Sequence, residues 1–259
     1  QERQGSEKEN ASWICAMATI RRNCHGHGAD KLCRNHLRSK AGNRLAPNPD
    51  DDRQTDPMSG FSLIDTLVRS TQALCAMQNG AMDDIVLQAM VKWPKVPACY
   101  GWLGLDARGR WYLRDETVQS AGGFAQSRGD WLQHDKLLAF IARNYGADPQ
   151  GQWFFQNGPQ RVYVELESTP WIWRIGPGQT VQSHTGLSTT VSACLVDELG
   201  RVYLATSLGL GLVHSQDVAL AADASEKGDS IVQNVRAEAL SEAFGYVGSP
   251  ARRQERSPY

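Results

Sequence analysis

The stretch Asp106-Ala107-Arg108-Gly109-Arg110-Trp111-Tyr112-Leu113 contains a pattern that the sequence repeats twice. The other copies are Asp148-Pro149-Gln150-Gly151-Gln152-Trp153-Phe154-Phe155 and Asp197-Glu198-Leu199-Gly200-Arg201-Val202-Tyr203-Leu204. Each copy joins an Asp-x-x-Gly turn to an aromatic-rich strand. The Asp carboxylate can accept hydrogen bonds from backbone amides two residues on, and Gly supplies the positive φ that closes the turn. The three copies therefore predict a β-rich domain built from repeated antiparallel hairpins.

The match between the second and third copies extends beyond the turn. Residues 151–169 and 200–218 both predict a strand, a polar or glycine-rich bend and a second strand, with a spacing of 49 residues. One interpretation is a duplicated β unit. The other is coincidence, since Asp-x-x-Gly hairpins are common in β-rich folds. The sequence leaves both open.

Further elements surround these hairpins. Apolar spacing predicts a helix over residues 132–144, and the polar, glycine-containing residues 117–130 are typical of a loop. The expected fold class is α+β: repeated antiparallel β-hairpin units with one or two packed helices. Strands are predicted over residues 100–105, 110–113, 152–156, 161–166, 171–175, 180–184, 190–196, 201–206 and 210–214.

The composition is typical of a soluble cytoplasmic protein. The chain has 259 residues and a formal net charge of −1, so its charge gives no argument for nucleic acid or an anionic membrane as partner. Arg252, Arg253 and Arg256 are too few for a nucleic-acid-binding stripe. No apolar run reaches the length of a membrane span. Six cysteines without CxxC spacing fit a reducing compartment better than a disulfide framework.

Residues 1–81 are predicted to be a disordered or non-native extension. Residues 1–57 are highly charged and lack periodicity, and such a segment cannot bury enough apolar surface to fold. Because the chain begins with Gln1, Met58 or Met82 is the predicted native start. The other expected units are residues 82–146 (helix, hairpin and helix), 147–246 (an antiparallel β unit with a terminal helix) and 247–259 (a polar tail).

Two features of this extension have alternative interpretations. It contains residues of metal-ligand type, namely Cys15, Cys24, His25, His27, Cys33 and His36. Zinc sites usually use two tight pairs, and only Cys33 and His36 form one, so a tail without metal is preferred. Residues 62–78 show helical apolar spacing, which predicts either an amphipathic helix packed on the domain or part of a leader.

The bend Gln156-Asn157-Gly158-Pro159 is the most informative candidate site. Asn-Gly between strands normally forms a type I′ hairpin, whose fourth residue donates its N–H to the first. Here the fourth residue is Pro159, which has no N–H, so we expect a more open bend. The polar groups of Gln156, Asn157, Gln160 and Arg161 would then be available to a ligand.

The strand after this bend alternates in character. Residues 162, 164 and 166 are apolar and predict the core face, whereas Arg161, Tyr163 and Glu165 share the other face. Arg161 offers a planar fork to a carboxylate or phosphate. The alternative is a solvated face with cross-strand ion pairs, which is the commoner case. Arg143 is a further ligand-binding candidate, although the helix dipole is a sufficient structural reason for it.

The sequence gives little support for catalysis. It has no Gly-x-Ser-x-Gly, no phosphate-binding glycine loop and no His-Glu-x-x-His, and we assign no catalytic residue, metal ligand or cofactor. His134, His184 and His214 are isolated and are expected to have structural roles. Cys99 could act as a nucleophile beside a histidine brought near by folding, but a buried structural thiol is the commoner case.

Two segments carry a family resemblance. They are Val96-Pro97-Ala98-Cys99-Tyr100-Gly101-Trp102-Leu103-Gly104-Leu105-Asp106 and Phe155-Gln156-Asn157-Gly158-Pro159-Gln160-Arg161-Val162. They resemble a family of uncharacterised β-proteobacterial proteins, a domain of unknown function, over residues 82 to about 246. The resemblance implies that the first 81 residues lie outside the domain.

A more distant resemblance rests on the order of elements: Asp-x-x-Gly-x-Trp, a short helix, a second Asp-x-x-Gly hairpin and a β-rich half. It is similar to another bacterial domain-of-unknown-function family. This resemblance implies a duplicated α/β motif with a pleckstrin-homology-like C-terminal half, a ligand site between the motifs and a role in signal transduction. Arg161 stands where that family tends to carry Lys after Glu, and Gln160 replaces the Glu, so a shared ligand is not implied.

The leading hypothesis is a cytosolic ligand-binding or regulatory protein that senses a small polar or nucleotide-like molecule. No membrane partner is expected, and the oligomeric state is left open. One alternative is an enzyme that uses Cys99 with a spatially adjacent His. Another is an interaction module that adds a partner strand to a sheet edge. The predicted ligand-binding residues are Asn157, Gln160, Arg161, Tyr163 and Arg143.

Overall fold

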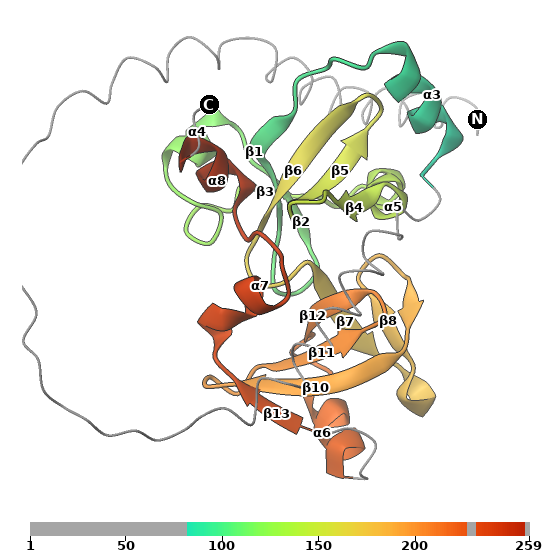
Figure 1. Ribbon diagram of the computed structural model, residues 1–259, viewed down its shortest axis with the longest axis vertical. Helices are drawn as coiled ribbons and strands as arrows, with labels where there is room; N and C mark the ends of the chain where they lie inside the picture. Colours follow the sequence, from blue (N-terminus) through green and yellow to red (C-terminus); the bar gives the residue numbers. More distant parts are fainter. Residues whose placement is uncertain (1–81, 227–231, 257–259) are drawn as a thin grey trace, which may run out of the picture.

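Two mixed β-sheets form the body of the molecule (Figure 1). The structure is a computed structural model and describes residues 82–226 and 232–256. The predicted extension, with its cysteine–histidine cluster and its candidate helix, lies outside the described residues. The strand order is β3-β2-β1-β6-β5-β4 in the first sheet and β13-β10-β11-β12-β7-β8-β9 in the second.

The first sheet and its helices come from the first half of the described chain. The helices are α3 (Asp84–Lys92), α4 (Glu116–Ser120) and α5 (Asp135–Arg143). The strands are β1 (Cys99–Leu105), β2 (Trp111–Leu113), β3 (Asp130–Trp131), β4 (Tyr145–Ala147), β5 (Trp153–Asn157) and β6 (Gln160–Leu166).

The second sheet follows without a long connection. Its strands are β7 (Trp171–Ile175), β8 (Val181–Ser183), β9 (Ser188–Thr189), β10 (Val191–Asp197), β11 (Val202–Thr206), β12 (Gly209–Val213) and β13 (Val232–Val235). The helical segments are η1 (Pro177–Gln179), α6 (Val218–Glu226), η2 (Ala237–Ala239), α7 (Leu240–Ala243) and α8 (Pro250–Arg256).

The two sheets share one strand order. In the first, the antiparallel triplets β1–β2–β3 and β4–β5–β6 are joined by parallel pairing of β1 with β6. In the second, the triplets β7–β8–β9 and β10–β11–β12 are joined by parallel pairing of β7 with β12, and β13 is added beside β10. The α+β class and the repeated hairpin units are therefore confirmed. Asp148 and Asp197 begin equivalent turns, β4–β5 and β10–β11.

The boundary between the segments that form the two sheets lies later in the chain than the sequence predicts. The predicted boundary follows residue 146, but β6 belongs to the first sheet and ends at Leu166, and β7 begins at Trp171. The reason is the parallel pairing of β6 with β1, which places Leu105 opposite Leu166. A contact between residues so far apart along the chain leaves no local sequence signal.

One apolar core joins the two sheets. The Trp153 ring of the first sheet meets the Trp171 ring of the second edge-on, with centroids 5.0 Å apart, and Trp171 stacks on Trp173 at 5.9 Å. The predicted core face of β6, residues 162, 164 and 166, lies in the same core. Aromatic pairs of this kind contribute roughly 1 kcal/mol beyond their buried area. The buried tryptophans thus stabilise the junction between the sheets.

Local capping signals account for two helix starts. The helix predicted over residues 132–144 forms as α5 after His134, whose Nδ1 accepts the Leu137 N–H at 3.3 Å. Inside the predicted loop, α4 forms because the Asp115 carboxylate accepts the Val118 N–H at 2.8 Å.

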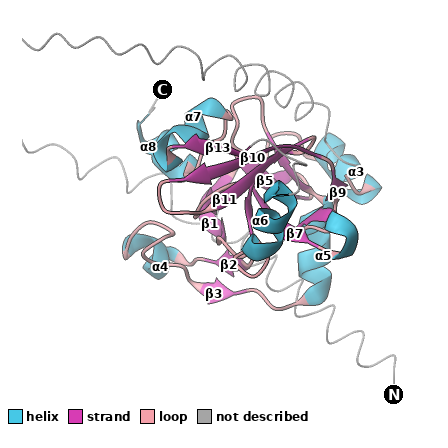
Figure 2. Cartoon of the chain, turned by 90° about the horizontal axis from the view of Figure 1, so that it is seen from below, coloured by secondary structure: helices cyan, strands magenta, loops and turns pink. Residues whose placement is uncertain are grey.

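Helices α3, α5, α7 and α8 lie around the strands in Figure 2. No helix in the described part of the chain has the length and apolar character that crossing a membrane requires.

The C-terminal segment contains a docked helix, α8, where the sequence predicts a polar tail after residue 246. Its start is fixed by buried Glu165, whose carboxylate accepts the Ser249 hydroxyl and, at 3.1 Å, the Ala251 N–H. Leu240 packs in a cluster of the second sheet, whereas α8 contacts β6 and β1 of the first. The C-terminal segment therefore contacts both sheets. The start of α8 is held by the Glu165 carboxylate, which lies more than 80 residues earlier in the sequence, so no local sequence pattern predicts the contact.

Candidate ligand-binding site

The third Asp-x-x-Gly turn shows how these turns are built. Asp197 Oδ1 accepts the N–H groups of Leu199 and Arg201 at 2.9 and 2.8 Å. Its Oδ2 accepts Arg201 Nε at 2.6 Å and the Tyr203 hydroxyl at 2.9 Å. Burial opposes ionisation of Asp197, but these hydrogen bonds outweigh it and hold the pKa of the carboxyl below its ordinary value. The role predicted for the turn Asp, accepting amides two residues on, is confirmed.

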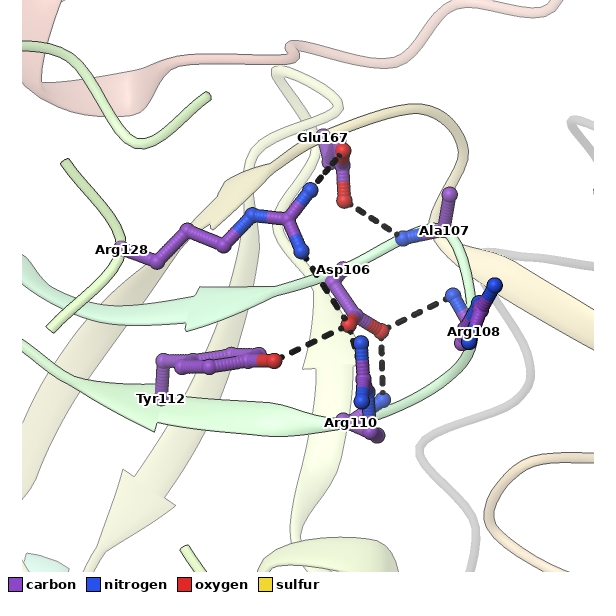
Figure 3. A network of polar contacts seen from close by, with 7 residues as sticks. All are labelled: Asp106, Ala107, Arg108, Arg110, Tyr112, Arg128 and Glu167. Carbon is purple, nitrogen blue, oxygen red and sulfur yellow. Dashed lines mark hydrogen bonds and ion pairs between the residues drawn. The ribbon is translucent and has the colours of Figure 1, made fainter. Parts of the chain in front are cut away.

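The first turn has the same donors and is joined to two further charges (Figure 3). Asp106 accepts two backbone N–H groups, Arg110 Nε at 2.8 Å and the Tyr112 hydroxyl at 3.2 Å. Arg128 forms ion pairs with Asp106 and Glu167, and Glu167 accepts a backbone N–H of the turn at 2.9 Å. Because Glu167 lies in the linker between the sheets, this network attaches the β1–β2 turn to the linker. Both carboxylates are occupied by these partners, so we assign the network a structural role.

The second turn replaces two of these donors. Gln152 stands where the other turns have Arg, and its Nε2 donates to Asp148 Oδ2 at 3.1 Å. Phe154 stands where the others have Tyr, and the hydroxyl comes instead from its cross-strand neighbour Tyr163, at 3.0 Å. The predicted ligand-binding hydroxyl of Tyr163 is therefore used by the turn, and burial raises the pKa of Tyr163.

A fourth turn of the same geometry joins β8 to β9. Ser183 Oγ accepts the N–H groups of Thr185 and Leu187 at 3.3 and 3.0 Å, and Gly186 has a φ of 85°. The sequence Ser183-His184-Thr185-Gly186 lacks a carboxylate, so a search for Asp-x-x-Gly does not find it. A search that also allows Ser, which makes the same local hydrogen bonds, would have found it.

The bend between β5 and β6 is a tight hairpin. Asn157 pairs with Gln160, so Gly158 and Pro159 are the two central residues. Gly158 has a φ of 58°, and Pro159 in the second central position needs no N–H, a combination that suits a type II′ turn. The open bend expected from the sequence is therefore wrong. The turn lies one residue later than the Asn-Gly pattern indicates, and its fourth residue is Gln160.

Three amide side chains around this hairpin have a buried atom without a partner, and we call them the tip amides. They are Gln156, Asn157 and Gln160, which are 1%, 6% and 0% exposed. The unpartnered atoms are Gln156 Oε1, Asn157 Nδ2 and Gln160 Oε1. Gln156 Nε2 donates to the Gly158 carbonyl at 2.8 Å and Gln160 Nε2 to the Pro97 carbonyl at 3.0 Å, so both glutamine orientations are fixed. Each buried polar atom left without a partner costs about 1–3 kcal/mol.

The predicted binding residues of this hairpin fall on two faces of the sheet. By strand alternation Arg161 and Tyr163 share one face, and Asn157 and Gln160 share the other. The exposed Arg161 guanidinium lies over the Phe154 ring, 4.6 Å from its centroid. A single small ligand therefore cannot contact both pairs, and the unpartnered atoms favour the face of Asn157 and Gln160.

Arg143 is held in an ion pair. Its Nε donates to Asp83 Oδ1 at 3.0 Å and its Nη2 to Asp83 Oδ2 at 3.2 Å. The hydrogen bonds from Arg143 lower the pKa of Asp83, and the Asp83 N–H donates to Asn144 Oδ1 at 3.1 Å. Asp83 immediately precedes α3, and Arg143 and Asn144 end α5. Arg143 thus attaches α3 to α5, which gives it a structural role in the described part of the chain.

The residues of the enzyme hypothesis do not form a reactive centre. Cys99 is 2% exposed in the apolar core and is disulfide-bonded, so it does not offer an exposed thiolate. The cysteine spacing predicted reduced cysteines, and the disulfide bond of Cys99 shows that this prediction is wrong for that residue. The imidazole nitrogens of His134 and His214 accept the backbone N–H groups of Leu137 and Gln216, which are structural roles.

His184 is a buried imidazole inside the aromatic core. Its Nδ1 accepts the Ile172 N–H at 3.3 Å, and its Nε2 has no hydrogen-bond partner. The rings of Trp111 and Tyr145 lie 5.6 and 5.8 Å away, centroid to centroid. Burial lowers the pKa of His184 to about 3, so the ring is neutral at physiological pH.

Comparison with known proteins agrees with the family expected from the sequence. The family model DUF2944, whose description reads "Protein of unknown function (DUF2946)", matches residues 82–251, more than half of the chain. The chain belongs to this family, DUF2944. No curated protein matches it. A DUF1285 family protein from Silicibacter pomeroyi DSS-3 has a similar solved structure, with a TM-score of 0.35 and 10% identity over 49% of this chain and 70% of that one.

Within the DUF2944 domain, sequence reasoning identified the right hairpin but not its surroundings. It did not identify Pro97 as the partner of Gln160, or the contacts of Asp83 with Arg143 and Asn144. Nothing local indicates Pro97 as the partner of Gln160, because the two are 63 residues apart.

Proposed function

We propose that this DUF2944 protein binds a small polar ligand without catalysis, and that Asn157 and Gln160 are its binding pair. One observation supports this above others: an unpartnered donor, Asn157 Nδ2, and an unpartnered acceptor, Gln160 Oε1, on one face of one hairpin. Directly opposed residues in a hairpin have Cβ atoms about 5 Å apart. The pair is therefore suited to a molecule that presents a carbonyl oxygen beside an N–H.

This pattern narrows the ligand class. A carboxylate or phosphate offers acceptors only, so it would leave the Gln160 oxygen unpartnered and would be repelled by it. A lactam edge, as several nucleobases have, offers one donor and one acceptor side by side. A nucleotide-like ligand is thus proposed to bind through its base. The outward-facing Arg161 plays no part in this recognition.

The two alternative functions receive less support. The enzyme hypothesis relied on Cys99 as its nucleophile, and Cys99 is buried and disulfide-bonded. Strand addition needs an available sheet edge, and the edge strands of both sheets, β3, β4, β9 and β13, span only two to four residues. Short edge strands are one way in which proteins prevent edge-to-edge pairing.

A thermal-shift screen of the full chain tests the proposal. The probes are nucleobases, nucleosides and nucleotides with and without a lactam edge, acetamide, and inorganic phosphate. A binding compound raises the melting temperature in a concentration-dependent way. We expect a lactam-bearing compound to do so, and the rise to vanish in Gln160→Met, which removes the acceptor while keeping the side-chain length.

The matched control is Gln182→Met, in the exposed position of β8. It should retain the ligand-induced shift. An unchanged shift in Gln160→Met would reject the binding pair. A shift with phosphate alone would reject the ligand class, and the absence of any shift would leave an ordered water as the sole occupant of the pair.

A further inference from the structure

We infer that residues 83–97, helix α3 and the segment leading into β1, form a lid over the binding pair and that the Asp83–Arg143 ion pair is its latch. The inference rests on the proposed function, since it concerns how a ligand reaches that site. Asn157 and Gln160 are 6% and 0% exposed. A ligand of any size can reach them only if a covering segment moves away.

Both ends of this segment are attached beside the hairpin tip. At its start, the Asp83 N–H donates to the side chain of Asn144, whose backbone carbonyl accepts the Gln156 N–H at 2.8 Å. At its end, the Pro97 carbonyl accepts Gln160 Nε2 at 3.0 Å. Figure 1 shows α3 and the following segment next to the tip of the β5–β6 hairpin. The segment is therefore linked to the hairpin at both of its ends, through Asn144 to the backbone of Gln156 and through Pro97 to the side chain of Gln160.

Helix α3 is held less firmly than its neighbour α5. Val86 is its one buried residue, and Ile85 and Val91 are 72% and 83% exposed. Helix α5, in contrast, buries both Leu137 and Ile141 in the core. An element with few buried apolar contacts opens locally at low cost, which is the property that a lid requires.

The latch is correspondingly weak. The Arg143 side chain is 54% exposed in its pair with Asp83. Salt screens an ion pair that is exposed to this extent, and its contribution is small compared with that of a buried pair. Breaking it should therefore raise the population of the open lid without unfolding the domain.

Hydrogen exchange of the full chain measures the lid in the absence of any ligand. Arg143→Met removes the latch, and Arg174→Met is the control, because it removes an Arg–Asp pair in the second sheet whose Arg side chain has a similar exposure, 52%. Two groups of protons are followed by NMR. They are the backbone amides of α3 and the side-chain amide protons of Asn157 and Gln160.

In Arg143→Met we expect both groups to exchange about two- to five-fold faster, the range that an exposed ion pair allows. Wild-type protein in high salt should show the same change, and Arg174→Met should show none. Faster exchange in α3 without faster exchange of the Asn157 and Gln160 side chains would overturn the lid. No change in either group, or the same change in Arg174→Met, would overturn the latch. These results are independent of the ligand screen, so failure of the lid and failure of the proposed function are distinguishable.

Discussion

Protonation of His184 is expected to destabilise the fold at mildly acidic pH. The imidazole has an ordinary pKa of 6.5, and burial in the aromatic core lowers it to about 3. As the pH falls, the unfolded chain therefore binds the proton before the folded protein does. The stability that the neutral ring contributes is complete above pH 6.5 and is lost progressively as the pH falls toward 3.

The magnitude follows from the width of this window. Where only the unfolded state binds the proton, the free energy of unfolding falls by about 1.4 kcal/mol per pH unit. The loss between pH 6.5 and pH 4 is then about 3 kcal/mol, and the loss over the whole window is about 5 kcal/mol. Either value is a large share of the roughly 5–15 kcal/mol that stabilises a typical domain.

The variant His184→Asn isolates this effect. Asn keeps an acceptor for the Ile172 N–H, which His184 Nδ1 now accepts, and it does not titrate. Urea unfolding of both proteins at pH 7.5, 6, 5 and 4 gives the pH dependence of their stability. The wild type should lose about 3 kcal/mol more than the variant by pH 4, because the carboxylates titrate in both proteins. The comparison uses only the change in the free energy of unfolding with pH, so a difference in stability between the two proteins at neutral pH does not affect it.

Parallel pH dependences, within about 0.5 kcal/mol of each other, would refute the reasoning, because a buried neutral imidazole must produce this difference. An NMR titration of the folded protein gives a second check. A midpoint for the His184 ring near its ordinary value would show that the core admits the charged ring.

Three further predictions concern the turns and the C-terminal helix. Tyr163→Phe removes a donor to the carboxylate of the second turn and should lower the free energy of unfolding by about 1–3 kcal/mol. Adding Phe154→Tyr restores the aromatic hydroxyl of the other turns and should recover part of the loss in urea unfolding; a further loss would contradict this account. Gly151→Ala should lower the melting temperature more than Gly200→Ala, because a Cβ at residue 151 would lie 2.0 Å from a backbone oxygen, whereas at residue 200 nothing lies within 4 Å. Both variants share a cost of about 1–2 kcal/mol for the left-handed backbone, so equal melting temperatures would show that the contact relaxes freely. Glu165→Ala should release α8, seen as faster hydrogen exchange in that helix with the second sheet unchanged, and unaltered exchange would exclude the docking role.

The turns could be predicted from the sequence because their hydrogen bonds are local. Asp106 and Asp197 accept amides two and four residues on, so a window of five residues contains these backbone hydrogen bonds. The same reasoning succeeds for α5, whose apolar spacing and capping histidine are adjacent in the chain. The prediction fails where the contacting residues lie far apart in the sequence. The pairing of β1 with β6 and the capping of α8 by Glu165 join residues that no local window contains.

In the candidate hairpin, the sequence predicted the location of the bend correctly and its turn geometry incorrectly. Its location was predictable, because a polar Gln-Asn-Gly-Pro-Gln stretch between two strands is unusual. Its geometry was not, because Asn-Gly and Gly-Pro both fit two-residue turns, and the two turn positions differ by one residue. In the structure Asn157 pairs with Gln160 and Phe155 with Val162, so Gly158 and Pro159 are the central residues of the turn. Gln160 is a buried strand residue in this arrangement, and its neighbour Arg161 lies on the opposite face by strand alternation.

The C-terminal segment has a consequence for protein synthesis. Glu165 is buried in β6, yet the two groups that satisfy its carboxylate, the Ser249 hydroxyl and the Ala251 N–H, are among the last described residues. While the ribosome is still translating the second sheet, this carboxylate has neither partner, and burying it alone would be costly. The first sheet therefore cannot reach its final state before the second has been made. A chain that terminates before Ser249 lacks both groups that satisfy this carboxylate, and it also lacks the helix that packs on β6.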